Sequence, residues 1–232
     1  MDKVMVITGT SKGIGRFLTE YYLDKGMSLI GCDLTESDLM QERYEHYQLD
    51  VSNEEAVRKM IALTVKKHKK IDYLINNAGI ASMNHSLLTP LSLVDKIFKT
   101  NFYGTFLFCR EVGKVMTKNK FGKIVNFTSV AVPLNLEGES IYAASKVAIE
   151  ELTRILAKEF GKNGITCNTI GPSPIRTDLI KNVSDEKLER LLSQQAINEF
   201  GSFEDVANVI DFYLSDRSRM ITGQTVYLGG VF

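Results

Sequence analysis

Short apolar runs alternate with helix-like segments along the whole of this 232-residue chain. The first run, Val4–Ile7, is apolar at every position, as is typical of a strand buried on both faces of a parallel sheet. We expect further strands at 27–32, 44–49, 71–76, 123–128, 165–170 and 225–228. We also expect one helix that ends near 25, one that begins near 53, and four that cover 92–118, 142–162, 184–195 and 204–215. The alternation predicts an α/β fold in one domain, 1–232, with a doubly wound parallel sheet of about seven strands between two layers of helices (α/β/α).

The residues least typical of a buried core fall where the expected strands end. These positions are Gly9, Asp33, Asp50, Asn77, Ser129 and Pro172. In open α/β sheets, ligands bind beyond the carboxyl ends of the strands. The sequence therefore predicts a ligand site along that edge of the sheet.

The charge balance argues against partners that need a strongly basic protein. The chain has 28 Lys plus Arg and 28 Asp plus Glu, so we expect no nucleic-acid and no membrane partner. The basic cluster 66–70 is interpreted as a solvated helix end. Cys32, Cys109 and Cys167 are far apart in apolar contexts, which indicates buried thiols in a reducing compartment and no metal site. Without a membrane-length apolar run or a secretory pattern, we expect a cytoplasmic protein.

A glycine-rich turn joins the first strand to the first helix. Gly9, Gly13 and Gly15 permit a tight turn and the close approach of a pyrophosphate to the helix N-terminus, although simple turn chemistry would also use glycine there. Asp33 closes the next strand, where a carboxylate binds an adenosine ribose. That carboxylate repels a 2′-phosphate and favours NAD(H) over NADP(H), whereas Lys12 in the turn argues the other way.

Tyr142 and Lys146 lie four residues apart in a segment without Pro or Gly, which we interpret as helical. The phenol and the ammonium would then be neighbours on one face. A nearby positive charge favours the phenolate, so we expect a lowered pKa for Tyr142 and a general acid/base that works near neutral pH. Taken alone, the pair is also what a solvated helix face would show.

Several motifs together resemble the short-chain dehydrogenase/reductase family. They occur in family order over nearly the whole chain: Thr8-Gly9-x-x-x-Gly13-x-Gly15, Asn76-Asn77-Ala78-Gly79, Asn101, Ser129 and Tyr142-x-x-x-Lys146. The tail 221–225 resembles the 3-oxoacyl-carrier-protein reductase branch and its sugar, polyol and steroid relatives.

The resemblance implies a Rossmann-type fold and NAD(P)-dependent hydride transfer between a nicotinamide and a ketone or secondary alcohol. Tyr142 would move the proton, Lys146 would lower its pKa and hold the nicotinamide ribose, and Ser129 would hydrogen-bond the substrate oxygen. Asn101 would hold a water that links Lys146 to solvent. The implied cofactor-binding residues are Gly9, Ser11, Lys12, Gly13, Ile14, Gly15, Asp33, Asp50 and Val51 (beside the adenine), Asn77, Ala78, Gly79, Tyr142, Lys146, Pro172, and Ile175 and Thr177 (beside the carboxamide).

The substrate side is harder to read from the sequence. We expect it to be built from 80–90, 130–141 and 173–200, the last acting as a charged lid. His85 is either a substrate contact or a surface-loop histidine. Pro-Ser-Pro at 172–174 replaces the family's usual Pro-Gly and stiffens the loop beside the nicotinamide. A 3-oxoacyl thioester, a sugar or polyol, and a small hydroxy compound all remain open as substrates.

Two further alternatives stay open. Ala144, Ala148, Leu152 and Ile155 form one stripe on the expected helix, which either packs within the monomer or, as the family resemblance favours, against a second copy in a homodimer or homotetramer. The chain is either an enzyme or a catalytically silent dinucleotide-binding sensor or scaffold. Because all four catalytic positions are filled, we favour the enzyme.

Overall fold

The computed structural model describes residues 3–178, 180–181 and 183–231. Leu179 and Asn182 of the expected lid lie outside these residues, as do 1–2 and 232 of the expected domain. Seven parallel strands form one sheet in the order β3-β2-β1-β4-β5-β6-β7. The strands are β1 (Val4–Thr8), β2 (Ser28–Asp33), β3 (Tyr44–Gln48), β4 (Tyr73–Asn76), β5 (Gly122–Phe127), β6 (Ile165–Gly171) and β7 (Thr225–Tyr227). The predicted doubly wound, Rossmann-type parallel sheet is confirmed.

The strand order reverses direction next to β1. The chain moves outward from β1 to β2 and β3, then returns so that β4 pairs with the other side of β1. This reversal opens a crevice at the carboxyl ends of β1 and β4, where such sheets bind ligands. The glycine turn follows β1 and Asn77 follows β4, so both lie at this crevice.

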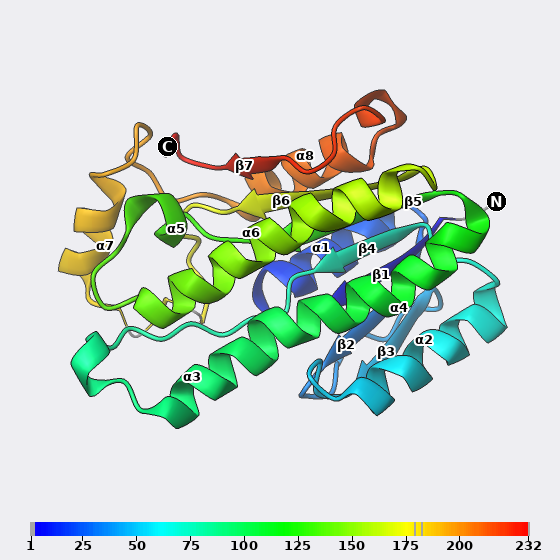
Figure 1. Ribbon diagram of the computed structural model, residues 1–232, viewed down its shortest axis with the longest axis horizontal. Coiled ribbons are helices and arrows are strands. Elements are labelled where there is room, and N and C mark those ends of the chain that lie inside the picture. Colours follow the sequence, from blue (N-terminus) through cyan, green and yellow to red (C-terminus); the bar gives the residue numbers. More distant parts are fainter. Residues whose placement is uncertain (1–2, 179, 182, 232) are drawn as a thin grey trace.

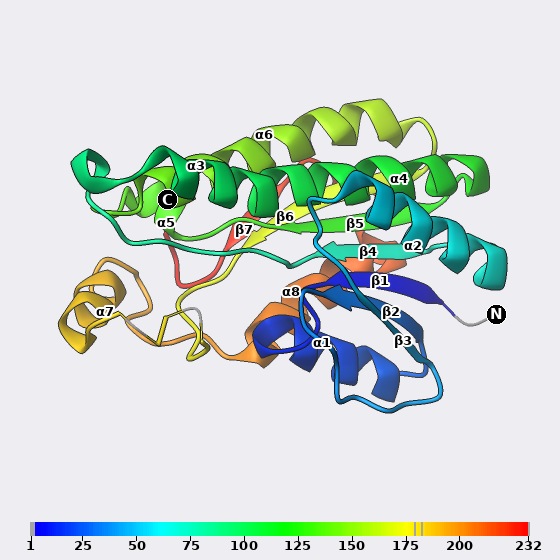
Figure 2. The same ribbon diagram turned by 90° about the horizontal axis from the view of Figure 1, so that it is seen from below.

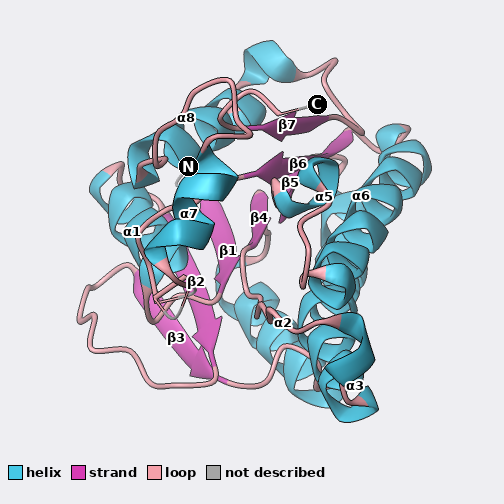
Figure 3. Cartoon of the chain, turned by 90° about the vertical axis from the view of Figure 1, so that its left-hand side faces the viewer, coloured by secondary structure: helices cyan, strands magenta, loops and turns pink. Residues whose placement is uncertain are grey.

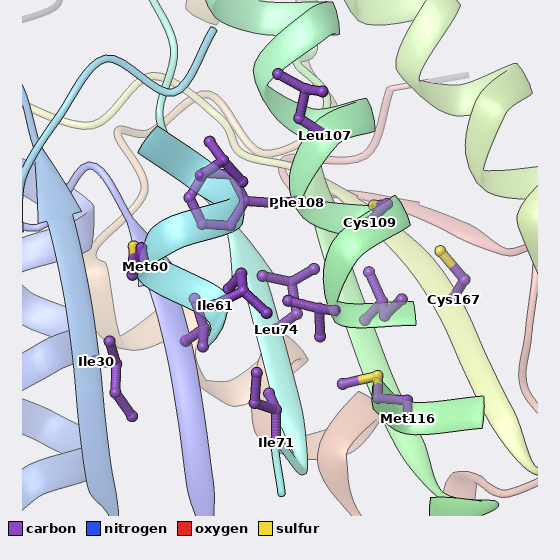
Figure 4. Close-up of a cluster of buried hydrophobic side chains, with 14 of the residues drawn as sticks. Ile30, Met60, Ile61, Ile71, Leu74, Leu107, Phe108, Cys109, Met116 and Cys167 are labelled. Atoms are coloured by element: carbon purple, nitrogen blue, oxygen red, sulfur yellow. The ribbon is translucent and has the colours of Figure 1, made fainter. Parts of the chain in front are cut away.

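Helices cover both faces of the sheet, as Figure 2 shows. One layer contains α2 (Glu54–His68), α4 (Gly104–Asn119) and α6 (Ser140–Gly161), and the other contains α1 (Gly13–Asp24) and α8 (Phe203–Leu214). Each layer buries its own apolar cluster against the sheet. The first cluster includes Phe108 of α4, Met60 of α2 and Leu74 of β4, which Figure 4 shows among the buried side chains. The apolar strands are therefore buried on both faces, as their sequences predict.

The remaining helices gather beyond the carboxyl ends of the strands. They are α3 (Leu91–Phe98), α5 (Ala131–Leu134) and α7 (Asp185–Leu192), with a 3₁₀ turn at Ser86–Leu88. Figure 1 shows α5, α7 and the start of α6 at the left end of the molecule, and Figure 3 shows α7 in front of the sheet at that end. These elements enclose the site from the substrate side.

The expected helix over 92–118 is interrupted. A π-helical turn, Lys99–Tyr103, separates α3 from α4 and contains Asn101. Single-turn π segments are rare and are often found at functional sites. The short elements α5 and Ser86–Leu88, and a 3₁₀ turn at Asp216–Ser218, carry no periodicity that a sequence reading could detect. Over the described ranges, no helix has the combined length and apolarity that crossing a bilayer would require.

Candidate active site

The glycine turn brings the backbone into very close contact. Gly9 has φ 76° and Gly13 has φ 57°, a region that favours glycine. A Cβ added to Gly15 would lie 1.9 Å from the carbonyl oxygen of Gly9. No described side chain caps α1, so its first-turn amides are available to an anion. The turn therefore fits the pyrophosphate of a dinucleotide.

Asn77 fixes this turn from the neighbouring strand. Its Nδ2 donates to the carbonyl oxygens of Thr8 at 3.0 Å and Gly9 at 3.1 Å, and the amide of Ala78 donates to Thr8 Oγ1 at 3.0 Å. The sequence suggested only that Asn77 and Ala78 line the cleft. The structure adds that they hold β1 and β4 in register at the crevice.

The expected adenosine side lies beyond β2 and β3. The Asp33 carboxylate accepts a hydrogen bond from the amide of Ser11 at 3.1 Å, which joins the glycine turn to the end of β2. Lys12 Nζ lies 3.4 Å from Asp178 in an exposed ion pair. At the end of β3, the Asp50 carboxylate accepts from the amide of Ser52 at 2.8 Å.

Val51 follows Asp50 but its side chain is turned inward. It is buried, and a Cβ added to Gly104 of α4 would lie 2.6 Å from Val51 Cγ2. The side chain thus packs into the helical layer. Its backbone remains the part available to border an adenine.

Helix α6 places Tyr142 and Lys146 on one face, both buried. Lys146 Nζ lies 5.7 Å from the centre of the Tyr142 ring and donates to the carbonyl oxygen of Phe127 at 3.0 Å. The Ser129 side chain is near enough to the Tyr142 phenol to act against the rise of its pKa. Ser129 Oγ also accepts from the amide of Ala131 at 3.2 Å, which fixes the serine at the end of β5. A serine, a phenol and an ammonium from β5 and α6 thus meet in one place.

The pKa of Tyr142 differs from the expectation. Burial raises it to about 12, and the nearby Ser129 side chain opposes that rise. Burial also lowers the pKa of Lys146 to about 8. For the chain by itself, the expected lowering of the Tyr142 pKa is wrong, because loss of water around the phenol outweighs the effect of its neighbours.

Asn101 lies in the π-helical turn with its amide fully engaged. Its Nδ2 donates to the carbonyl oxygen of Ile80 and to Ser145 Oγ, both at 3.0 Å, while its Oδ1 accepts from the amide of Ile80 at 2.9 Å. A Cβ added to Gly79 would lie 3.4 Å from both Asn101 Oδ1 and Lys146 Nζ. Asn101 therefore ties the segment after β4 to α6 close to Lys146. The water expected at Asn101 stays a prediction.

A cavity of about 950 Å³ adjoins this group of side chains. Its walls include nine residues singled out from the sequence: Ile14, Asn77, Gly79, Ser129, Tyr142, Lys146, Pro172, Ile175 and Thr177. All three expected substrate segments contribute, and α7 forms one side. Asn101 and the residues expected around the adenosine do not line it. His85 lines the cavity and is exposed, with Nδ1 accepting from the amide of Leu87 at 3.4 Å.

Sequence reasoning missed three charged residues of this cavity: Glu139, Lys187 and Arg190. Glu139 lines the wall just before α6, and burial raises its pKa to about 7. Its position one helical turn before Tyr142 was a usable signal, since residues three apart share a helix face. Among the described residues, no group of three or more His, Cys, Asp or Glu is arranged to hold a metal ion.

A family model described as enoyl-(acyl carrier protein) reductase matches residues 9–230. The chain belongs to the short-chain dehydrogenase/reductase family. It is 29% identical to the 3-oxoacyl-[acyl-carrier-protein] reductase FabG of Staphylococcus epidermidis, over 99% of this chain and 98% of the relative. It is 33% identical to an NAD-dependent glycerol dehydrogenase of Listeria innocua, over 99% of this chain and 93% of the relative.

Solved structures of this family superpose closely on the chain. A 4-hydroxyisoleucine dehydrogenase complexed with NADH has a TM-score of 0.89 at 32% identity, covering 99% of this chain and 98% of the other. ElxO with NADP bound has a TM-score of 0.90 at 29% identity, covering 98% and 97%. The protein is accordingly an NAD(P)-dependent oxidoreductase of alcohols and ketones, and its nicotinamide cofactor fits the glycine turn described above.

Proposed function

We propose that Tyr142 moves the proton between substrate oxygen and protein while a bound nicotinamide accepts or gives the hydride. Ser129 hydrogen-bonds the substrate oxygen as charge develops on it. Lys146 supports the phenolate and binds the nicotinamide ribose, and Asn101 holds a water on the path from Lys146 to solvent. The observation that carries this proposal is the meeting of Ser129, Tyr142 and Lys146 at one cavity wall.

The raised pKa of Tyr142 sets how much the phenolate must be stabilised when the cofactor binds. Bringing the pKa from about 12 to near 7 requires about 7 kcal/mol of preferential stabilisation of the phenolate. At an effective dielectric constant of about 20, one full charge about 6 Å away contributes about 3 kcal/mol. Lys146 is already present in the chain for which the pKa of Tyr142 is about 12, so the stabilisation must come from a bound ligand. The positive charge of an oxidised nicotinamide in the same cavity is a natural source of part of it.

The remaining cofactor assignments follow the sequence reasoning. The backbone of the glycine turn, including Ser11 and Ile14, would bind the pyrophosphate, and Asp50 and Val51 would border the adenine. Ile175 and Thr177 would meet the carboxamide beside Pro172. Asp33 favours NAD(H) over NADP(H), and the ion pair of Lys12 with Asp178 weakens the opposing argument from Lys12. The NAD-dependent relative agrees with this preference, whereas ElxO with NADP bound does not.

The test is a Tyr142→Phe variant. We expect kcat for reduction of a carbonyl panel with NADH or NADPH to fall by about 10²–10⁴, the range for losing a general acid/base. Cofactor affinity, measured by quenching of NADH fluorescence, should change less than about threefold. Full turnover by Tyr142→Phe would remove Tyr142 from its role.

We also propose a single domain over 1–232, with 173–200 as the lid, in a cytoplasmic homodimer or homotetramer. The stripe on α6 supports assembly, since Ala144 and Ile155 are exposed and Ala148 and Leu152 half-buried in the monomer. A 3-oxoacyl thioester, a sugar or polyol, and a small hydroxy compound remain the substrate classes. The alternative of a silent sensor or scaffold finds no support, since the curated relatives are named for enzyme activities.

A further inference from the structure

The cavity wall beside Tyr142 contains a carboxylate that the proposed mechanism does not use. Glu139 stands three residues before Tyr142, and both line the cavity. The negative charge of Glu139 acts on Tyr142, whose pKa it helps to raise. Glu139 and Tyr142 therefore face the same part of the cavity, where the charge of one acts on the other.

Glu139 has no partner within the described ranges. Its side chain makes no capping hydrogen bond to α6, and burial is the sole cause of its raised pKa. Other glutamates that are at least half-buried are partnered: Glu45 by Lys67 and His68, Glu111 by Arg110 and Lys114, and Glu150 by the hydroxyls of Thr128 and Tyr227. A partly desolvated carboxylate without a partner costs free energy that a ligand can recover.

Apart from Lys146, which donates to the carbonyl oxygen of Phe127, the lysine and arginine side chains that line this cavity come from α7. Lys187 and Arg190 extend from α7, and Lys187 Nζ lies 3.4 Å from Met83 Sδ. Neither contributes to the pKa of Glu139. The cavity thus holds a carboxylate near Tyr142 that neither Lys146 nor the cations of α7 neutralise. A ligand with a cationic group near its reacting carbon matches this arrangement.

We propose that Glu139 determines specificity by binding an ammonium group that the substrate carries a few bonds from its carbinol or carbonyl carbon. The substrate class is then amino alcohols and hydroxy amino acids, with the corresponding ketones. The inference rests on the proposed function, because it places the reacting carbon at Tyr142. Pairing with a cation also removes the charge that opposes proton loss from Tyr142.

Three alcohols of nearly equal size test the proposal: 4-amino-2-butanol, 1,3-butanediol and 2-pentanol, which differ only in an ammonium, hydroxyl or methyl group at the far end. Oxidation is followed by NADH or NADPH formation. We expect wild-type kcat/KM to be highest for the amino alcohol. In Glu139→Gln, the ratio of kcat/KM between 4-amino-2-butanol and 2-pentanol should fall at least tenfold, mainly through KM.

Two matched variants separate binding from other effects. Glu151→Gln removes an exposed charge of the same helix that pairs with Arg154 and should leave the ratio unchanged. In Lys187→Met the ratio should not fall, because the variant removes a positive charge from the cavity. A fall equal to that of Glu139→Gln would overturn the proposal. Equal wild-type kcat/KM for the three alcohols, a preference for the diol, or inactivity towards all three would overturn it too.

The failure of this inference can be told from failure of the proposed function. Turnover of 2-pentanol or of a 3-oxoacyl thioester that disappears in Tyr142→Phe, together with an unchanged ratio in Glu139→Gln, overturns only the inference. Absence of cofactor binding, or full turnover by Tyr142→Phe, overturns the proposed function as well.

Discussion

The two halves of the active-site crevice are built differently. The cofactor half is made of backbone: the glycine turn, the first amides of α1, and the carbonyl oxygens that Asn77 holds. The substrate half is made of loops and short helices from 80–90, 130–141 and 173–200, and exposes charged side chains such as Lys187 and Arg190. Backbone geometry admits few alternatives, whereas loop side chains can be exchanged singly. The comparison indicates that cofactor binding is fixed by the fold and substrate choice by individual residues.

The largest effect is expected from Gly15→Ala in the cofactor half. The new Cβ would overlap the carbonyl oxygen of Gly9, from which it would lie 1.9 Å, so the turn must open. We expect the dissociation constant for NADH to rise more than about 100-fold, measured by fluorescence with circular dichroism as a check on folding. Gly161→Ala is the matched control, because its Cβ meets open space, and should bind normally. Unchanged affinity for NADH in Gly15→Ala would contradict the claim that backbone geometry fixes cofactor binding.

Lys146→Met probes the point where the two halves meet. The pKa of this lysine falls from 10.5 to about 8 on folding, so the buried charge destabilises the protein most below pH 8, and the cost fades by about pH 10. After subtracting about 1 kcal/mol for the lost hydrogen bond to Phe127, Lys146→Met should raise the free energy of unfolding by about 2 kcal/mol at pH 7.

That gain should approach zero near pH 10. Urea unfolding of both proteins at the two pH values measures it, with turnover lost in the variant. A Lys146→Met protein that is less stable than the wild type at pH 7 would contradict the claim that burying the Lys146 charge destabilises the protein. An equal change in the free energy of unfolding at both pH values would also contradict it.

Asp33→Ala tests cofactor choice. Removing the carboxylate removes its repulsion of a 2′-phosphate, so we expect the preference for NADH over NADPH to shift by about tenfold towards NADPH. The ratio of the two dissociation constants is the readout, because the hydrogen bond from Ser11 is lost for both cofactors. Asp24→Ala, at the exposed end of α1, should keep the wild-type ratio. An unchanged ratio in Asp33→Ala would remove this residue from the selection of NAD.

The smallest effect belongs to the substrate half. Lys187→Met loses the contact of its Nζ with Met83 across the cavity mouth, and we expect KM for the best substrate to change about two- to fivefold. The dissociation constant for NADH should stay constant, as it should in Lys158→Met on the exposed surface of α6. A weaker affinity for NADH in Lys187→Met would show that the two halves are not independent.

The sequence specified the fold and the cofactor half closely, because both rest on local rules. All seven strands were predicted to within a few residues, most of them from apolar runs, and the glycine turn and the Tyr142–Lys146 spacing follow from backbone and helix geometry. Tertiary burial decided what could not be predicted. The sequence shows that Lys146 is one helical turn from Tyr142, but not that both are buried so deeply that the phenol becomes less acidic. The π-helical turn and the unpaired state of Glu139 also depend on contacts distant in sequence.

The most direct test of the account is a titration of Tyr142 with and without oxidised cofactor. Tyrosinate formation, followed by ultraviolet difference absorbance, should occur in the free protein only far above neutral pH, since the pKa of Tyr142 is about 12. With NAD⁺ bound, the account predicts one additional tyrosinate that titrates at least about 2 pH units lower than in the free protein and is absent from Tyr142→Phe. Identical titrations with and without NAD⁺, or an extra tyrosinate that persists in Tyr142→Phe, would contradict the claim that Tyr142 becomes the acid/base when the cofactor binds.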